Sequence, residues 1–162
     1  MRRALAWTFV SSLALATVGQ TQEPKKMPAH VILPEAQLVW GEGPPFLPKG
    51  GLSAILSGDP SKPAEYTLRA KLPAGYKIAP HWHPTDEHVT VLSGSVAFGM
   101  GDKYVMADMQ TLPAGGYAVM PANMRHYFLA KTACVIQVHG TGPFAITYIN
   151  PADDPRNATP AK

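Results

Sequence analysis

The chain has 162 residues, which is enough for one domain with a substantial hydrophobic core. Its formal net charge is +3, only 15% of its residues are charged, and no basic run is longer than Lys25-Lys26, so a nucleic-acid-binding protein is disfavoured. The 17 prolines and 14 glycines disfavour long helices and favour short strands joined by turns.

The first 20 residues have the pattern of a secretory signal peptide. Arg2 and Arg3 precede an apolar stretch, and Ala14-Leu15-Ala16 offers a small-residue cleavage site. We therefore expect residues 1–20 to be removed and the protein to be periplasmic or secreted, with no stable membrane anchor afterwards. A retained N-terminal anchor is the alternative, although the apolar stretch is short for a membrane span.

The rest of the chain is predicted to be an all-β domain. Residues 21–50 read as an extended N-terminal segment, residues 51–150 as a barrel or sandwich, and residues 151–162 as a loose tail. The run 65–72 alternates between apolar and polar residues, as a half-buried strand does. The other predicted strands cover residues 52–56, 89–92, 95–100, 117–120, 126–130, 134–139 and 144–149. Residues 104–111 fit either a short strand with a loop or one helical turn.

The stretch from Pro80 to His88 carries three histidines and two carboxylates between two predicted strands. Side chains two apart on a strand share a face, so His81 and His83 point the same way. Two neutral imidazoles followed by a carboxylate provide the mixed nitrogen and oxygen donors of a divalent metal site. A polar loop with solvated histidines is the alternative.

The spacing of these residues resembles the two motifs of the cupin superfamily. Gly75, His81-x-His83, Glu87 and Gly94 reproduce the first motif in full, and Gly115, Pro121 and His126 follow the second. Two positions of the second motif differ, because Asn123 replaces a glycine and Ala130 replaces the final asparagine. The chain is also similar to small exported cupins related to the cupin domain of the anti-sigma factor ChrR.

The resemblance implies a double-stranded β-helix, or jelly-roll barrel, that holds one metal ion. His81, His83, Glu87 and His126 would be the ligands, and the ion would be divalent iron, manganese, nickel, copper or zinc. If Glu87 points into the barrel, strand alternation turns His88 away from the metal. A shifted register would instead make His88 the ligand, with Glu87 next to a ligand rather than on the metal. His139 either orients a ligand, acts as an acid or base, or is an ordinary core histidine.

Two functions follow from a metal site with open coordination positions. The first is a metal-dependent enzyme of dioxygenase, isomerase or lyase type that acts on a small molecule. The alternative is a non-catalytic protein that contains a metal and binds or senses a small ligand. A homodimer is an open alternative to the monomer, and the fold alone selects no reaction.

Overall fold

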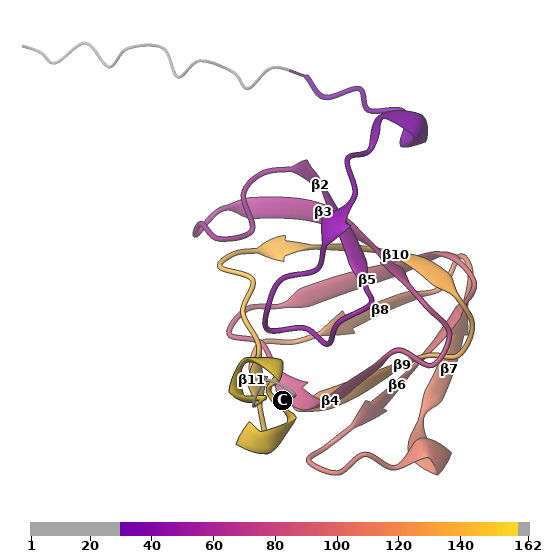
Figure 1. The fold of residues 1–162 in the computed structure, drawn as a ribbon, viewed down its shortest axis with the longest axis vertical. Helices are drawn as coiled ribbons and strands as arrows, with labels where there is room; N and C mark the ends of the chain where they lie inside the picture. Colours follow the sequence, from indigo (N-terminus) through magenta and orange to yellow (C-terminus); the bar gives the residue numbers. More distant parts are fainter. Residues whose placement is uncertain (1–29, 159–162) are drawn as a thin grey trace, which may run out of the picture. The chain divides into compact units, whose positions relative to one another are not determined.

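The computed structural model describes residues 30–158, of which residues 31–158 form one compact unit (Figure 1). The predicted signal peptide and residues 159–162 lie outside the described residues. Between residues 30 and 158, no helix has both the length and the apolar character needed to cross a membrane. The strands and 3-10 turns are η1 (Glu35–Gln37), β1 (Gly41–Glu42), β2 (Leu52–Ser57), β3 (Glu65–Leu72), β4 (Lys77–Trp82), β5 (Glu87–Ser93), β6 (Ser95–Met100), η2 (Met106–Asp108), β7 (Gln110–Pro113), β8 (Tyr117–Met120), β9 (His126–Ala130), β10 (Cys134–Thr141), β11 (Thr147–Tyr148), η3 (Pro151–Asp153) and η4 (Pro155–Asn157).

The strands form two antiparallel sheets that enclose the core, which confirms the predicted double-stranded β-helix (Figure 1). One sheet has the order β1-β2-β3-β10-β5-β8 and the other the order β11-β4-β9-β6-β7. The strand β10 pairs with both β3 and β5, so it joins parts of the chain that are far apart in sequence. The two sheets therefore bring the histidine stretch and the second motif to the same interior.

The predicted strand limits agree with the structure at β3, β6, β8 and β9. The prediction of one strand over residues 144–149 is wrong in extent, because only Thr147 and Tyr148 pair with β4. The preceding side chains pack into the interior instead, where Phe144 contacts Tyr66 and Ile146 is buried. Both alternatives for residues 104–111 are present, as η2 and the start of β7.

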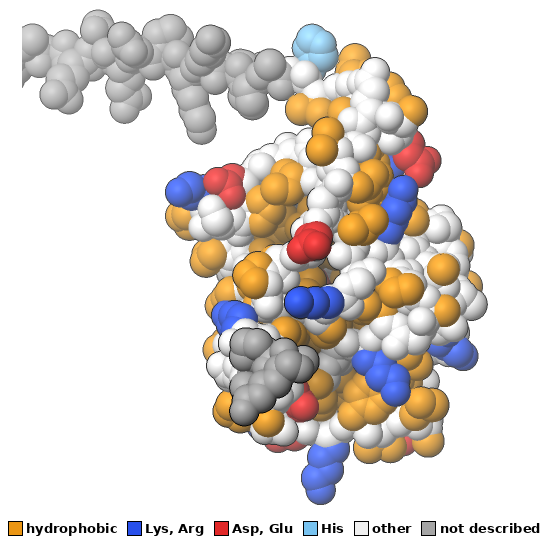
Figure 2. Space-filling view, viewed as in Figure 1, with side chains coloured by type: hydrophobic (Ala, Val, Ile, Leu, Met, Phe, Trp, Pro, Cys, Tyr) orange, Lys and Arg blue, Asp and Glu red, His pale blue; other side chains and the backbone are white. Residues whose placement is uncertain are grey.

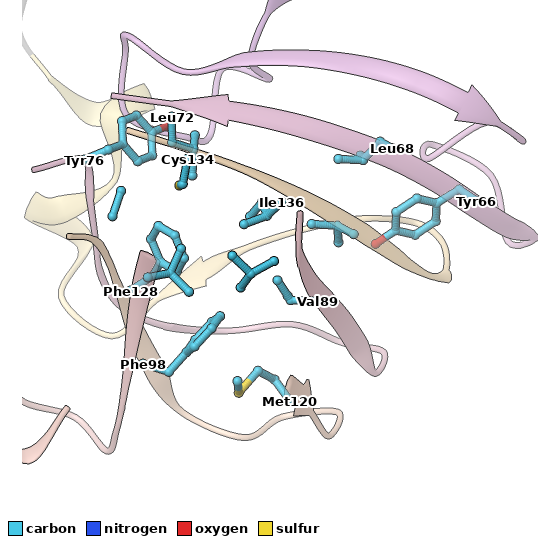
Figure 3. Packing of buried hydrophobic residues seen from close by; sticks show 14 residues of the cluster. Tyr66, Leu68, Leu72, Tyr76, Val89, Phe98, Met120, Phe128, Cys134 and Ile136 are labelled. Carbon is cyan, nitrogen blue, oxygen red and sulfur yellow. The ribbon is translucent and has the colours of Figure 1, made fainter. Parts of the chain in front are cut away.

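The core lies between the two sheets and is almost entirely apolar (Figure 3). The alternation predicted for β3 is seen in the burial of Tyr66, Leu68 and Leu72, whose side chains belong to the core cluster. Cys134 is a free, buried thiol within this cluster. Burying these side chains stabilises the barrel by roughly 1.5 to 3 kcal/mol for each large one.

Two turn residues explain how the motif positions shape the backbone. Gly94 links β5 to β6 with a φ of +74°, and a Cβ there would lie 2.3 Å from the carbonyl oxygen of Ala133, so only glycine fits. Asn123 has a φ of 64° and is the only non-glycine residue with positive φ among residues 30–158. Asparagine tolerates this conformation better than most residues, which explains how it replaces a motif glycine.

Residues 43–51, which we call the strap, cross one opening of the barrel between β1 and β2. The Tyr76 hydroxyl donates to the carbonyl of Pro48 at 2.5 Å, and the Tyr148 hydroxyl donates to the carbonyl of Phe46 at 2.8 Å. The Phe46 ring also meets the Phe144 ring edge-on, with centroids 5.6 Å apart. These contacts tie the strap to β11 and to the turn before β4.

The surface offers no sign of a basic patch on the face drawn in Figure 2. Lysine and arginine side chains are scattered there singly among apolar and polar groups. This distribution agrees with the absence of a basic run in the sequence.

Candidate metal centre

Three histidines meet inside the barrel. His81 lies on β4, His83 directly follows that strand, and His126 is the first residue of β9, where it is the cross-strand partner of His81. Each imidazole offers a nitrogen, and these nitrogens lie within 4.8 Å of one another. The side chains are only 1–3% exposed, which is unusual for three titratable groups that share one site.

Backbone carbonyls hold each imidazole in the orientation that a metal ligand needs. Nδ1 of His81 lies 2.7 Å from the carbonyl oxygen of Ala79, Nδ1 of His83 lies 2.7 Å from that of Ala145, and Nδ1 of His126 lies 3.0 Å from that of Met124. A carbonyl can only accept, so Nδ1 carries the proton and donates in all three rings. The three Nε2 atoms are therefore left as lone-pair donors.

Glu87, the first residue of β5, brings a carboxylate from the other sheet. Its Oε2 lies 3.5 Å from Nε2 of His83 and 3.6 Å from Nε2 of His126. Burial by itself would raise the pKa of this carboxyl, but the neighbouring imidazoles, with His83 foremost, lower it to about 2. Glu87 is therefore an anion at neutral pH.

The charge states of the histidines suit a cation. Burial, reinforced by the neighbouring His126 and His83, lowers the pKa of His81 to about 3, and burial also lowers the pKa of His83 although Glu87 opposes the shift. Nε2 of His83 is buried and has no hydrogen-bond partner among residues 30–158. A buried nitrogen without a partner is costly, and a metal ion at this point would satisfy it. These residues therefore fit a divalent metal with nitrogen and oxygen ligands.

The cluster opens into a cavity of about 60 Å³ in the barrel interior. Among residues 30–158, the ionisable side chains that line it are the three histidines, Glu87 and Tyr76, and no lysine or arginine of this range does so. The remaining wall is mainly apolar and includes Leu68, Phe98, Phe128, Ile136, Val138 and Ile146. Strap residues Gly43, Pro44, Leu47 and Gly51 also line it, so the strap closes part of the cavity.

His88 and His139 lie outside this cavity. Along β5, Glu87 and the buried Val89 face inward, so His88 faces outward, as strand alternation requires. His139 on β10 is the cross-strand partner of His88, and their rings stack with centroids 4.8 Å apart. The structure thus brings His81, His83, Glu87 and His126 together and sets the other two histidines apart.

Sequence reasoning did not identify the residues that brace the cluster. The Phe144 ring stacks on His83 with centroids 5.4 Å apart and an interplanar angle of 19°, and the Tyr148 ring lies 6.0 Å from His81. Both aromatics also contact the strap, so they connect the cavity cover to the candidate ligands. The aromatic residues of the run 144–149 were the available signal.

Comparisons with known proteins agree on the family of the barrel. A family model described as a cupin domain matches residues 68–138. None of the curated protein sequences compared with the chain matched it.

Solved structures share the fold over most of the chain. A putative acetylacetone dioxygenase from Methylibium petroleiphilum is 22% identical, with a TM-score of 0.62 over 82% of this chain and 90% of that one. The polyketide cyclase RemF from Streptomyces resistomycificus is 14% identical, with a TM-score of 0.62 over 78% of this chain and 90% of that one. KdgF from Halomonas sp. is 17% identical, with a TM-score of 0.53 over 72% of this chain and 96% of that one.

These similarities agree with the barrel topology and with the motif residues that surround the histidine cluster. The matched segment 68–138 contains all four candidate ligands. The family model and the shared fold identify residues 68–138 as a cupin domain.

Proposed function

We propose that this protein is a metal-dependent enzyme that acts on a small molecule, with His81, His83, Glu87 and His126 as the metal ligands. The observation that carries the proposal is the convergence of three Nε2 atoms and one carboxylate on an otherwise apolar cavity. A bound divalent ion supplies Lewis acidity, and iron in addition supplies dioxygen chemistry.

The protein's own residues prepare this site before any substrate arrives. The carbonyls of Ala79, Ala145 and Met124 fix the tautomers, so no proton has to leave the imidazoles when they bind a cation at neutral pH. Glu87 contributes the single negative charge of the four donors. The apolar wall and the strap limit the entry of water, which strengthens electrostatic interactions within the cavity.

The charge of the site suggests the class of substrate. With Glu87 as the one anion among the donors, a divalent ion leaves one positive charge uncompensated, and the described residues that line the cavity include no lysine or arginine. A buried charge without a partner is unfavourable, so a ligand that binds as a monoanion is favoured. The best fit is a small molecule with two neighbouring oxygens, such as an enolised diketone, a catechol or a hydroxy acid, and an apolar body.

The lining residues also favour one type of reaction. Apart from the four candidate ligands, the one ionisable side chain is Tyr76, whose hydroxyl is engaged by Pro48 and whose pKa burial raises to about 12. No further side chain among the described residues that line the cavity is suited to act as an acid or base at neutral pH. This favours a dioxygenase-type reaction over an isomerisation or elimination that needs a separate base.

The same lack of a separate acid or base also supports the alternative function. A protein that only binds or senses a small anion needs the cation and the shaped cavity but no proton transfer. Measurement of turnover separates these two readings.

The experiment starts with untagged protein and with the double variant His81→Ala/His83→Ala. Elemental analysis is expected to find about one divalent metal per chain in the wild type and a loss of metal in the double variant. His30→Ala, which removes an exposed histidine, is the control and should retain the metal. Equal metal content in wild type and double variant would refute the proposed site.

Oxygen uptake is then measured with the metal-loaded wild type and a panel of diketones, catechols and hydroxy acids. Consumption of oxygen that depends on both substrate and metal supports the enzyme. Saturable calorimetric binding of one of these compounds, without oxygen uptake or any change in the compound, supports the binding protein instead.

We also propose that the protein acts outside the cytoplasm after removal of residues 1–20. N-terminal sequencing of the protein from periplasmic and extracellular fractions tests this proposal. A chain that begins near residue 17 to 21 supports it, and intact chains confined to the cytoplasm contradict it.

A further inference from the structure

A second pair of histidines lies on the outer face of the six-stranded sheet. His88 on β5 and His139 on β10 are cross-strand partners, and their rings stack with an interplanar angle of 11°. Nδ1 of His88 lies 2.5 Å from the hydroxyl oxygen of Tyr117 on β8. Both histidines are half-buried, and we call them the outer histidine pair.

The outer histidine pair lines a cleft that is separate from the barrel cavity. The side chains of Glu65 and Asp86 line the same cleft, together with several threonines, and no lysine or arginine in the described part of the chain does so. Asp86 accepts the backbone N–H of Ala122 through Oδ1. The cleft therefore carries two negative charges and no positive one, which favours a cation.

The ring nitrogens of the pair are available as ligands. Among the described residues, no hydrogen bond occupies Nε2 of His88 or either nitrogen of His139, while Nδ1 of His88 is engaged by Tyr117. When Nδ1–H donates to the Tyr117 oxygen, Nε2 of His88 keeps its lone pair. A phenol hydroxyl can donate as well as accept, so Tyr117 holds the His88 ring in position but is compatible with either tautomer.

The two rings are also close enough to share one ion. Metal–nitrogen bonds of about 2.0–2.1 Å place two ligating nitrogens within roughly 4 Å of each other. The ring centroids lie 4.8 Å apart on neighbouring strands, and a rotation of the His139 ring would be needed to bring one of its nitrogens into this range. Water would complete the coordination, and Glu65 and Asp86 would contribute negative charge at longer range.

We propose that His88 and His139 form a second divalent metal site on the outside of the barrel, selective for zinc, copper or nickel over magnesium and calcium. Imidazole ligands favour the former three ions, whereas magnesium and calcium need oxygen ligands. The site has two protein nitrogens and stands open to solvent, so its ion exchanges faster and binds more weakly than an ion held by the buried cluster. The proposal is independent of the activity of the barrel cavity.

Zinc binding to untagged protein tests this proposal at pH 7.5, with equilibrium dialysis against zinc chloride and calorimetry. We expect His139→Ala and His88→Ala each to bind one equivalent less than the wild type. His30→Ala removes an exposed histidine that does not line the cleft and should bind as the wild type does. Tyr117→Phe removes the hydroxyl that orients His88 and should weaken the second equivalent by about 10- to 100-fold.

A result in which His139→Ala and the wild type bind equal amounts of zinc overturns the proposal. Circular dichroism of each variant shows whether it is folded. Wild-type protein provides a measurement that needs no variant, because the imidazole NMR signals of His88 and His139 should shift as the weaker equivalent of zinc binds. Unchanged signals at saturation overturn the proposal as well.

Discussion

Acidification of the metal-free protein should unfold the barrel through His81. This side chain is 2% exposed, and burial is the main reason why its pKa falls from 6.5 to about 3. Below pH 6.5 the unfolded chain binds a proton at His81 that the folded chain does not bind. The contribution of His81 to the free energy of unfolding is therefore fully present above pH 6.5 and is lost as the pH falls toward 3.

The expected size of this effect follows from the two pKa values. At pH 4.5 an unfolded histidine lies two pH units below its pKa, while His81 in the fold is still neutral. Protonation of this one side chain in the unfolded state therefore lowers the free energy of unfolding by about 2.7 kcal/mol. Burial lowers the pKa of His83 too, so its contribution has the same sign. Such a loss is a large part of the stability of an ordinary domain.

Urea denaturation of chelator-treated protein between pH 7.5 and pH 4.5 measures this dependence. His81→Gln should show a shallower decrease, because it removes one of the groups that take up a proton on unfolding. Stability that stays constant between these pH values would refute the reasoning. If His81→Gln does not fold, NMR titration of wild-type His81 decides the matter, since a ring that is protonated at pH 5.5 or above contradicts the low pKa.

Three further predictions concern single side chains. Glu87→Gln removes the one anionic donor and should weaken zinc binding by the cluster at least about tenfold. Asp102→Asn changes an exposed carboxylate and should leave zinc binding unchanged. Competition with a chelator measures the zinc affinity of both variants. Gly94→Ala should lower the free energy of unfolding by about 2 kcal/mol or more, because it combines backbone strain with a clash against Ala133. Gly75 also has a positive φ, of +80°, but a Cβ there would meet open space, so Gly75→Ala should lower the free energy of unfolding by only about 1 kcal/mol. Equal urea midpoints for the two variants would contradict this prediction. Tyr148→Phe leaves the Phe46 carbonyl without its donor, so it should cost about 1 kcal/mol and speed hydrogen exchange in the strap. Tyr117→Phe removes a hydroxyl that contacts His88 and not the strap, so it should leave hydrogen exchange in the strap unchanged. Unchanged exchange in Tyr148→Phe would argue against the strap contact.

Local patterns in the sequence were enough to predict several strands and the family of the fold. The clean alternation of residues 65–72 defines β3 because one face of that strand is buried and the other is not. The turn at Asn123 could also be predicted from residue type, because asparagine tolerates a positive φ better than most residues. The jelly-roll topology was predicted from the cupin motif, whose spacing is typical of that fold.

Long-range contacts were beyond the reach of the sequence. The pairing of β10 with β3 joins residues more than 60 positions apart, and no local pattern specifies such a partner. The run 144–149 resembles a strand because it is apolar. Phe144 instead packs against His83 and the strap, and a buried residue outside a strand produces the same apolar pattern. The cover of the cavity and the outer histidine pair likewise depend on which strands are neighbours.

The distribution of the four candidate ligands over both sheets bears on how the protein would select its metal. His81 and His126 meet across β4 and β9, while Glu87 reaches His126 from β5, so the complete donor set exists only after the barrel has closed. An unfolded chain offers isolated histidines, which favour copper and zinc by intrinsic affinity. If the chain crosses a membrane before it folds, the ion in the barrel is set by the metals available in the compartment where folding finishes, rather than by those in the compartment of synthesis.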